Sequence, residues 1–202
     1  KGASDRWLGY NAPESAMDTK AVKSEKGWVL NGRKHYISNG FDASLYIIYA
    51  NTKPGFGMQD GTSSFIVPRD TPGLNVVRCN ETVGCRFMNN GELELINCMI
   101  PHENILIEHK ALPSAGIYFK PGKIIQAAKN LGVGQAALER TAEFVQTYSR
   151  GGKLLIKHQA VASRLADMAT RIAALRSLVM QAAKSVDTKS PDAEALCNMA
   201  KV

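Results

Sequence analysis

Short apolar runs, some continuous and some alternating with polar residues, fill the region between Trp28 and Leu106 and predict β-strands. The clearest runs cover residues 45–50, 64–67, 74–77 and 92–96. Turn residues separate these runs and no helical period comes between them, so the pattern predicts a small antiparallel β-barrel or sandwich. Residues 1–21 show little periodicity, and we expect an irregular start there.

Residues 25–40 predict a tight hairpin, because Asn31-Gly32 is a preferred two-residue turn. Its arms would be Gly27–Leu30 and Arg33–Ser38. The second arm ends in Tyr36, Ile37 and Ser38, which offer a ring face, an apolar side chain and a hydroxyl in one row. Such a row suits a planar heteroaromatic cofactor, although an ordinary hairpin with a core tyrosine is the commoner cause of this spacing.

Beyond Pro121 the apolar residues recur with a helical period. One face of the first helix collects Leu131, Leu138, Ala142 and Val145. We expect Gly151-Gly152 to end this helix, a second helix to carry an apolar stripe over residues 165–186, and a third to begin at Asp192. Such helices form an incomplete antiparallel bundle, which needs a partner chain or a longer sequence. The fold class expected is therefore α+β.

Composition narrows the possible partners. The chain has 202 residues and a formal net charge of +7, but its basic residues are scattered, which disfavours nucleic acid and suits a phosphate-bearing cofactor or a CoA ester. The four cysteines form no CxxC pair and the four histidines lack metal-ligand spacing, so no metal site is predicted. No apolar run is long enough for a membrane span, and no secretion signal is visible.

A relaxed dinucleotide fingerprint occurs at Gly132-Val-Gly134. That fingerprint requires a preceding strand and a later acidic residue. These glycines lie within a helical pattern instead, so we interpret them as small residues at a helix contact.

Residues 29–40 read Val-Leu-Asn-Gly-Arg-Lys-His-Tyr-Ile-Ser-Asn-Gly and resemble the Asn-Gly-x-Lys-x-Trp-Ile-Thr-Asn-Gly signature of acyl-CoA dehydrogenases. Further segments resemble the family in the same order: 64–68, 70–73, 100–106, 132–138, 152–160 and 165–169. The resemblance covers nearly the whole chain from Met17. It implies a middle β-domain over 1–112 and a truncated C-terminal helical domain over 113–202.

The resemblance implies FAD as cofactor. Tyr36, Ile37 and Ser38 would lie against the flavin ring, with the Ser38 hydroxyl in place of the family's threonine at flavin N5. His158 and Gln159 would contact the flavin nucleotide from a neighbouring subunit. The cofactor would carry the redox chemistry.

The same resemblance implies an oxidoreductase of fatty acid metabolism that dehydrogenates an acyl-CoA thioester. It also implies a homo-oligomer, a dimer or tetramer, that passes electrons to a carrier protein. The expected location is the cytoplasm, or the mitochondrial matrix in a eukaryote. The 202 residues alone are expected to be inactive.

The sequence also departs from the family. Residues 7–16 replace the Thr-Glu-Pro-Gly-Ala-Gly-Ser-Asp block, and Gly122 stands where some subfamilies place the catalytic glutamate. Lys120 and Lys123 align with the Asp and Arg that help to seat the substrate, so they are the substrate-binding candidates. Further departures are Met88, Asn90, Tyr148 and Gly151. No catalytic base can be named, because we expect Glu103 and Glu108 to be solvated.

Two other functions stay open. The departures are compatible with a degenerate, non-catalytic module that binds acyl-CoA or a protein. Some relatives with the same fold are flavin oxidases or monooxygenases, in which oxygen reaches the reduced flavin.

Overall fold

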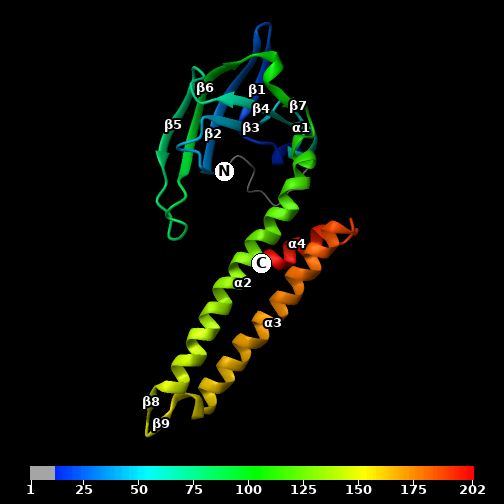
Figure 1. Ribbon diagram of the computed structural model, residues 1–202. Coiled ribbons are helices and arrows are strands. Elements are labelled where there is room, and N and C mark those ends of the chain that lie inside the picture. The colour runs from blue at the N-terminus through cyan, green and yellow to red at the C-terminus, as the bar shows by residue number, and fades with distance from the viewer. Residues whose placement is uncertain (1–11) are drawn as a thin grey trace. The chain divides into compact units, whose positions relative to one another are not determined.

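The computed structural model describes residues 12–202 and divides the chain into two units, Lys1–Ala115 and Gly116–Val202 (Figure 1). The boundary falls within helix α2 (Ala111–Thr147). Residues 1–11, which include the first half of the replaced block at 7–16, lie outside the described part.

Among residues 12–202, seven strands form one sheet in the order β5-β6-β2-β1-β3-β4-β7. The strands are β1 (Lys20–Ser24), β2 (Gly27–Ser38), β3 (Leu45–Asn51), β4 (Thr62–Pro68), β5 (Leu74–Cys79), β6 (Asn90–Ile100) and β7 (Ile105–Ile107). Neighbours are antiparallel, except that β1 and β3 meet in parallel at the single pair Lys20–Asn51. The four predicted runs are confirmed as parts of β3, β4, β5 and β6. The expected irregular start is wrong at Lys20 and Ala21, which begin β1.

Short helical segments complete this unit: η1 (Pro13–Ser15), α1 (Met58–Gly61) and η2 (His102–Asn104). The core lies between the inward side chains of the strands, and its largest fully buried members are Phe65, Leu30, Leu93, Leu95 and Ile100. Trp28 packs on Phe65 with ring centroids 5.4 Å apart. The alternation in the sequence therefore follows the burial of one face of each strand.

The predicted hairpin at Asn31-Gly32 is wrong. β2 runs unbroken through both residues, and the turn that joins it to β1 is at residues 25–26. The extra residue lies on β6 instead, where Asn97 has φ +47° and its N–H donates to Asn31 Oδ1 at 2.7 Å. Gly32 is needed because a Cβ there would lie 2.6 Å from Thr19 Cα. The Asn-Gly pair thus accommodates a bulge and a close backbone approach rather than a turn.

The helical unit contains the greater part of α2, then β8 (Ser149–Arg150), β9 (Lys153–Leu154), η3 (Leu155–Lys157), α3 (Gln159–Asp187) and α4 (Ala193–Lys201). The second and third predicted helices are confirmed. The first begins at Ala111, ahead of the expected start, and Pro121 lies inside it. Exposed apolar residues in its first turns obscure any single apolar face there, which explains the late predicted start. Gly151-Gly152 does not end the helix but forms the tip of the β8–β9 hairpin, where both residues have positive φ.

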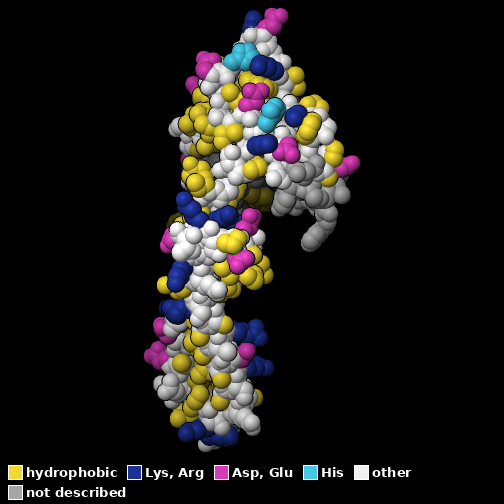
Figure 2. All heavy atoms as spheres, turned by 90° about the vertical axis from the view of Figure 1, so that its right-hand side faces the viewer, with side chains coloured by type: hydrophobic (Ala, Val, Ile, Leu, Met, Phe, Trp, Pro, Cys, Tyr) yellow, Lys and Arg dark blue, Asp and Glu magenta, His cyan; other side chains and the backbone are white. Residues whose placement is uncertain are grey.

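Helices α2 and α3 run side by side in opposite directions (Figure 1), and Arg176 on α3 donates to Gln135 Oε1 on α2 at 3.0 Å. A small core forms where α4 folds back on α3, around Ala127, Val179, Ala182, Cys197 and Ala200. Large apolar side chains remain exposed along the helices, among them Ile125, Val133, Phe144 and Met180. Figure 2 shows such a stripe along the helical unit. None of the described helices has the length and apolar character that crossing a bilayer requires.

The close approach at Gly32 predicts a sharp effect of a single methyl group. Gly32→Ala should lower the free energy of unfolding by about 1–3 kcal/mol, because a side chain there meets the Thr19 backbone and the φ of +147° is strained. Urea unfolding of the purified protein measures this difference. Gly84→Ala is the control, since nothing lies within 4 Å of a Cβ at that position. Equal stability of the two variants would contradict the packing described here.

Candidate functional site

A bulge near the end of β2 includes Tyr36, the first of the three predicted flavin-contacting residues. Lys34 pairs with Leu93 and Ile37 with Gly91, so β2 uses one residue more than β6 over this interval. Tyr36 occupies the bulge with φ +56° and is 65% exposed. The alternation changes phase here. Ile37 consequently turns toward the core, against which it packs half-buried.

The loop after Ser38 is held by hydrogen bonds to its backbone. The Tyr46 hydroxyl donates to the Gly40 carbonyl at 3.0 Å. Arg69 Nη1 donates to the carbonyl oxygens of Phe41 and Ala43. These contacts fix the loop that runs from Ser38 to the start of β3.

A buried carboxylate on β6 anchors the strand on the other side of the bulge. Glu92 is 1% exposed, and its two oxygens accept from Arg33 Nε and Arg78 Nε at 2.6 Å each. His35 Nδ1 lies 3.4 Å from the same carboxylate. Burial opposes the charged form, but the hydrogen bond from Arg78 and the charges of Arg33, Arg78 and His35 outweigh it and lower the pKa of Glu92. Residues 33 and 35 of β2 are thereby tied to β6 just before Tyr36.

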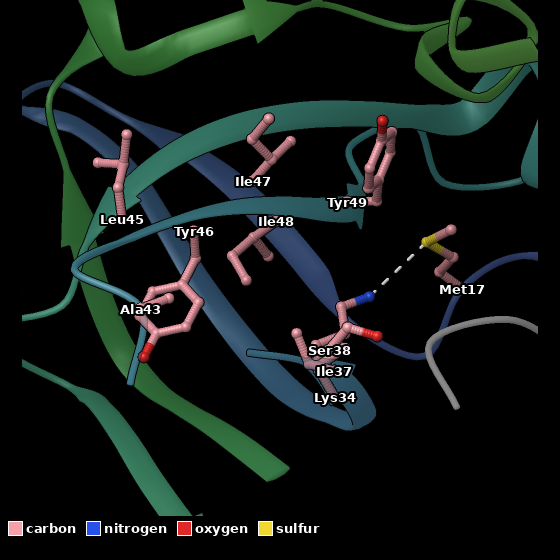
Figure 3. A pocket seen from close by; sticks show the side chains of 10 residues that line it. All are labelled: Met17, Lys34, Ile37, Ser38, Ala43, Leu45, Tyr46, Ile47, Ile48 and Tyr49. Carbon is pink, nitrogen blue, oxygen red and sulfur yellow. Dashed lines mark hydrogen bonds between the residues drawn. The ribbon is translucent and has the colours of Figure 1, made fainter. Parts of the chain in front are cut away.

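A cavity of about 450 Å³ opens between the second half of β2 and β3 (Figure 3). β1 pairs with β2 only over Gly27–Asn31. Beyond Asn31, none of the described strands lies between β2 and β3. The described lining residues are Met17, Lys34, Ile37, Ser38, Ala43, Leu45, Tyr46, Ile47, Ile48 and Tyr49. Most of them are apolar, and none of them is acidic.

Lys34 is the charged residue in this lining. It is 5% exposed, and its Nζ lies 3.8 Å from Met17 Sδ. Burial lowers its pKa to about 8, against a smaller opposing effect of Asp18. Lys34 is not among the site residues predicted from the sequence. The signal was its spacing, because Trp28, Leu30, Gly32 and Lys34 fall in one inward row of an unbroken strand.

The predicted site residues fall into two groups. Ile37 and Ser38 line the cavity, while Tyr36 lies in the adjoining bulge. The other candidates belong to the helical unit. His158 caps the start of α3, with Nε2 3.0 Å from the Arg150 carbonyl oxygen, and Gln159 is the exposed first residue of that helix.

Lys120 and Lys123 are half-buried on α2, far from His158 within the helical unit. With a helical rise of ~1.5 Å per residue, Lys123 and Thr147 are about 36 Å apart along the axis. His158 follows the hairpin after Thr147, so one chain does not bring these substrate and nucleotide candidates together.

The other histidines and glutamates considered in the β-sheet unit lie outside the cavity lining. His109 Nδ1 lies 3.2 Å from Thr52 Oγ1, and His102 Nε2 lies 3.4 Å from the Glu25 carbonyl oxygen. Glu103 and Glu108 are exposed, as predicted. No group of three or more His, Cys, Asp or Glu residues that could hold a metal ion occurs within residues 12–202.

Two family models match this chain. The model of the acyl-CoA dehydrogenase middle domain matches residues 2–98. The model of the acyl-CoA dehydrogenase C-terminal domain matches residues 115–202. Together the two matches include β1 to β5, most of β6 and nearly all of the long helices.

Individual relatives agree with these matches. An acyl-CoA dehydrogenase of Bacillus subtilis (strain 168) is 35% identical over 173 residues, which are 83% of this chain and 44% of that protein. The crystal structure of acyl-CoA dehydrogenase from Geobacillus kaustophilus has a TM-score of 0.83 at 28% identity, over 96% of this chain and 51% of that one. The structure of PigA with FAD and proline has a TM-score of 0.82 at 28% identity, over 95% of this chain and 51% of that one. The chain thus spans about half the length of these relatives.

The buried Glu92 predicts a specific acid sensitivity. Because its folded-state pKa is depressed, its contribution to stability is present above its ordinary pKa of 4.5 and is lost as the pH falls through the lower folded-state value. Glu92→Gln should lower the urea midpoint at neutral pH and reduce the fall in stability below pH 4.5. Urea unfolding from pH 3 to 7 measures both effects. The exposed Glu81→Gln is the control, and an acid profile of Glu92→Gln identical to that of the unchanged protein would refute the role of the cluster.

Proposed function

Because this chain belongs to the acyl-CoA dehydrogenase family, we propose that it forms part of a flavoprotein that oxidises an acyl-CoA thioester to its α,β-unsaturated form with FAD. The observation that carries the proposal is the cavity bounded by Ile37 and Ser38. It adjoins the three residues that resemble the flavin-contacting segment of the family. The fold and the family are shared with the relatives, whereas the activity of the whole protein is our proposal.

The cavity has the properties that a flavin ring requires. Its volume of about 450 Å³ lies in the range of small-molecule sites, which are mostly apolar with a few placed polar groups. Ile37 offers an apolar contact, and the Ser38 hydroxyl and the Lys34 ammonium offer donors. The isoalloxazine ring is flat and carries its acceptor atoms on one side, so its shape and polarity match this lining.

When bound, FAD supplies the ability to accept a hydride from the substrate. The chain's own residues orient and shield the ring. Ile37 excludes water from one part of the cavity, and Ser38 donates a hydrogen bond to the ring. The Glu92 cluster and the hydrogen bonds from Tyr46 and Arg69 keep these two residues in place, as catalysis by alignment demands.

The proton acceptor for the substrate α-carbon is not among the described cavity residues, since none of them is acidic. Gly122, on α2, has no side chain to serve as one. We therefore assign to this chain the binding of the cofactor ring and leave the base to another part of the enzyme.

We also propose a homo-oligomer in which His158 and Gln159 of one copy contact the flavin nucleotide of another. The long separation between His158 and Lys123 within one chain supports this arrangement. The exposed apolar side chains along the helices support it as well, because an interface between copies would bury them. Acyl-CoA as substrate, an electron carrier protein as acceptor, and the cytoplasm or the mitochondrial matrix as location complete the proposal.

Flavin binding and reduction test this function directly. The protein at its natural full length should show a visible flavin spectrum with added FAD, and anaerobic butyryl-CoA should bleach it. A protein that binds acyl-CoA but no flavin would overturn the proposal in favour of a non-catalytic module. Reduced flavin that oxygen reoxidises within the turnover time would indicate an oxidase instead.

A single hydroxyl provides a sharper test of the site. Ser38→Ala should weaken FAD binding by about 3- to 10-fold, since one hydrogen bond contributes about 0.5–1.5 kcal/mol. Fluorescence titration with FAD measures the change. Ser44→Ala is the matched control, because Ser44 is exposed and nearby but does not line the cavity. Equal affinity of both variants would exclude Ser38 from the flavin site.

A further inference from the structure

The Lys34 side chain is a buried cation with a weak partner. Its residue is 5% exposed, and the hydrogen-bond acceptor of its Nζ is the thioether of Met17, at 3.8 Å. Thioether sulfur is a poor acceptor, whereas an ammonium group has three donors to satisfy. Among residues 12–202, no carboxylate forms an ion pair with Lys34.

The burial of Lys34 changes the pKa of its ammonium group. Loss of hydration lowers the pKa of Lys34 to about 8, and the charge of Asp18 opposes only part of that shift. A buried charge without a strong acceptor is destabilising. The fold nevertheless keeps a lysine here, in the inward row that begins with Trp28 and Leu30.

The Lys34 side chain borders the cavity. Lys34, Ile37 and Ser38 lie together at one wall of it in Figure 3, with Tyr46 and Ile48 of β3 drawn across from them. The ammonium is therefore next to the two residues that we assign to the flavin ring. An acceptor atom of a ligand in this cavity would be close enough to replace the interaction with Met17.

We propose that Lys34 binds the flavin ring, donating a hydrogen bond from its ammonium group to an oxygen or nitrogen acceptor on the pyrimidine side of the isoalloxazine. This inference rests on the proposed function and adds a specific residue to it. The reduced ring carries more negative charge than the oxidised one, so a cation at this edge stabilises the reduced form more. Lys34 therefore raises the reduction potential of the bound flavin in addition to increasing its affinity.

The titration of Lys34 provides a readout that a packing role would not give. The charged group that acts on Lys34 is Asp18, from the segment before β1, while Tyr46 and Tyr49 of β3 line the same cavity. The charged form of Lys34 binds the acceptor, and in the free protein that form is lost as the pH rises through about 8. The affinity for FAD should accordingly fall as the pH increases from 7 to 9.

The experiment compares Lys34→Met and Lys34→Gln with the unchanged protein at its natural full length, using FAD as the probe. Lys34→Met should fold at least as stably, since it removes a buried charge and keeps the volume, but should bind FAD about tenfold more weakly. Lys34→Gln keeps a donor without the charge and should recover part of the affinity. In both variants the dependence of affinity on pH between 7 and 9 should disappear.

The reduction potential separates this role from a structural one. If reduced flavin loses tenfold more affinity than oxidised flavin, the two-electron potential of Lys34→Met falls by about 30 mV. Lys20→Met is the control, because Lys20 is exposed on β1 and outside the cavity lining.

Wild-type affinity, potential and pH profile in Lys34→Met would overturn the inference while leaving the proposed function in place. An unchanged protein that binds no FAD would overturn the proposed function and this inference together.

Discussion

The pairing of β2 with β6 is the constraint on which the site depends. Two interruptions occur in this pairing, and they lie on opposite strands. The first is on β6 at Asn97, so β2 keeps its inward row through Gly32 to Lys34. The second is on β2 at Tyr36, which turns Ile37 inward again. Without the second bulge, Tyr36 would lie on the inner face of the sheet and Ile37 on the outer face.

The two faces of this strand segment perform different tasks. On the outer face, Arg33 and His35 contact the buried Glu92 carboxylate, which also accepts from Arg78 on β5. Three strands are therefore joined at one charged group just before the bulge. On the inner face, Lys34 enters the cavity between β2 and β3. The ion pairs on the outer face fix this part of β2. The buried Lys34 ammonium is therefore held at a defined position in the cavity, where a ligand can accept a hydrogen bond from it.

The sequence predicts the elements well because alternation and helical periodicity report burial directly. It fails where the conformation depends on a partner strand. Asn31-Gly32 has the composition of a hairpin turn, but the approach of Thr19 and the bulge at Asn97 determine its role. The start of α2 was placed late because its first turns expose Ile117, Tyr118 and Phe119. Tyr36, Ile37 and Ser38 were predicted from their residue types and from the resemblance, and Lys34 could have been found as the lysine of the same signature or by following the inward row past Gly32.

In the proposed complex, the cavity beside the β2 bulge receives a flavin ring whose acceptor atoms contact Lys34. The most direct measurement is a crystal structure of the natural full-length protein with FAD. We expect the ring to lie against Ile37 and Ser38, with Lys34 Nζ about 2.7–3.2 Å from an oxygen or nitrogen of the pyrimidine ring. A flavin bound elsewhere, or a ring in this cavity with Lys34 still directed to Met17, would contradict it.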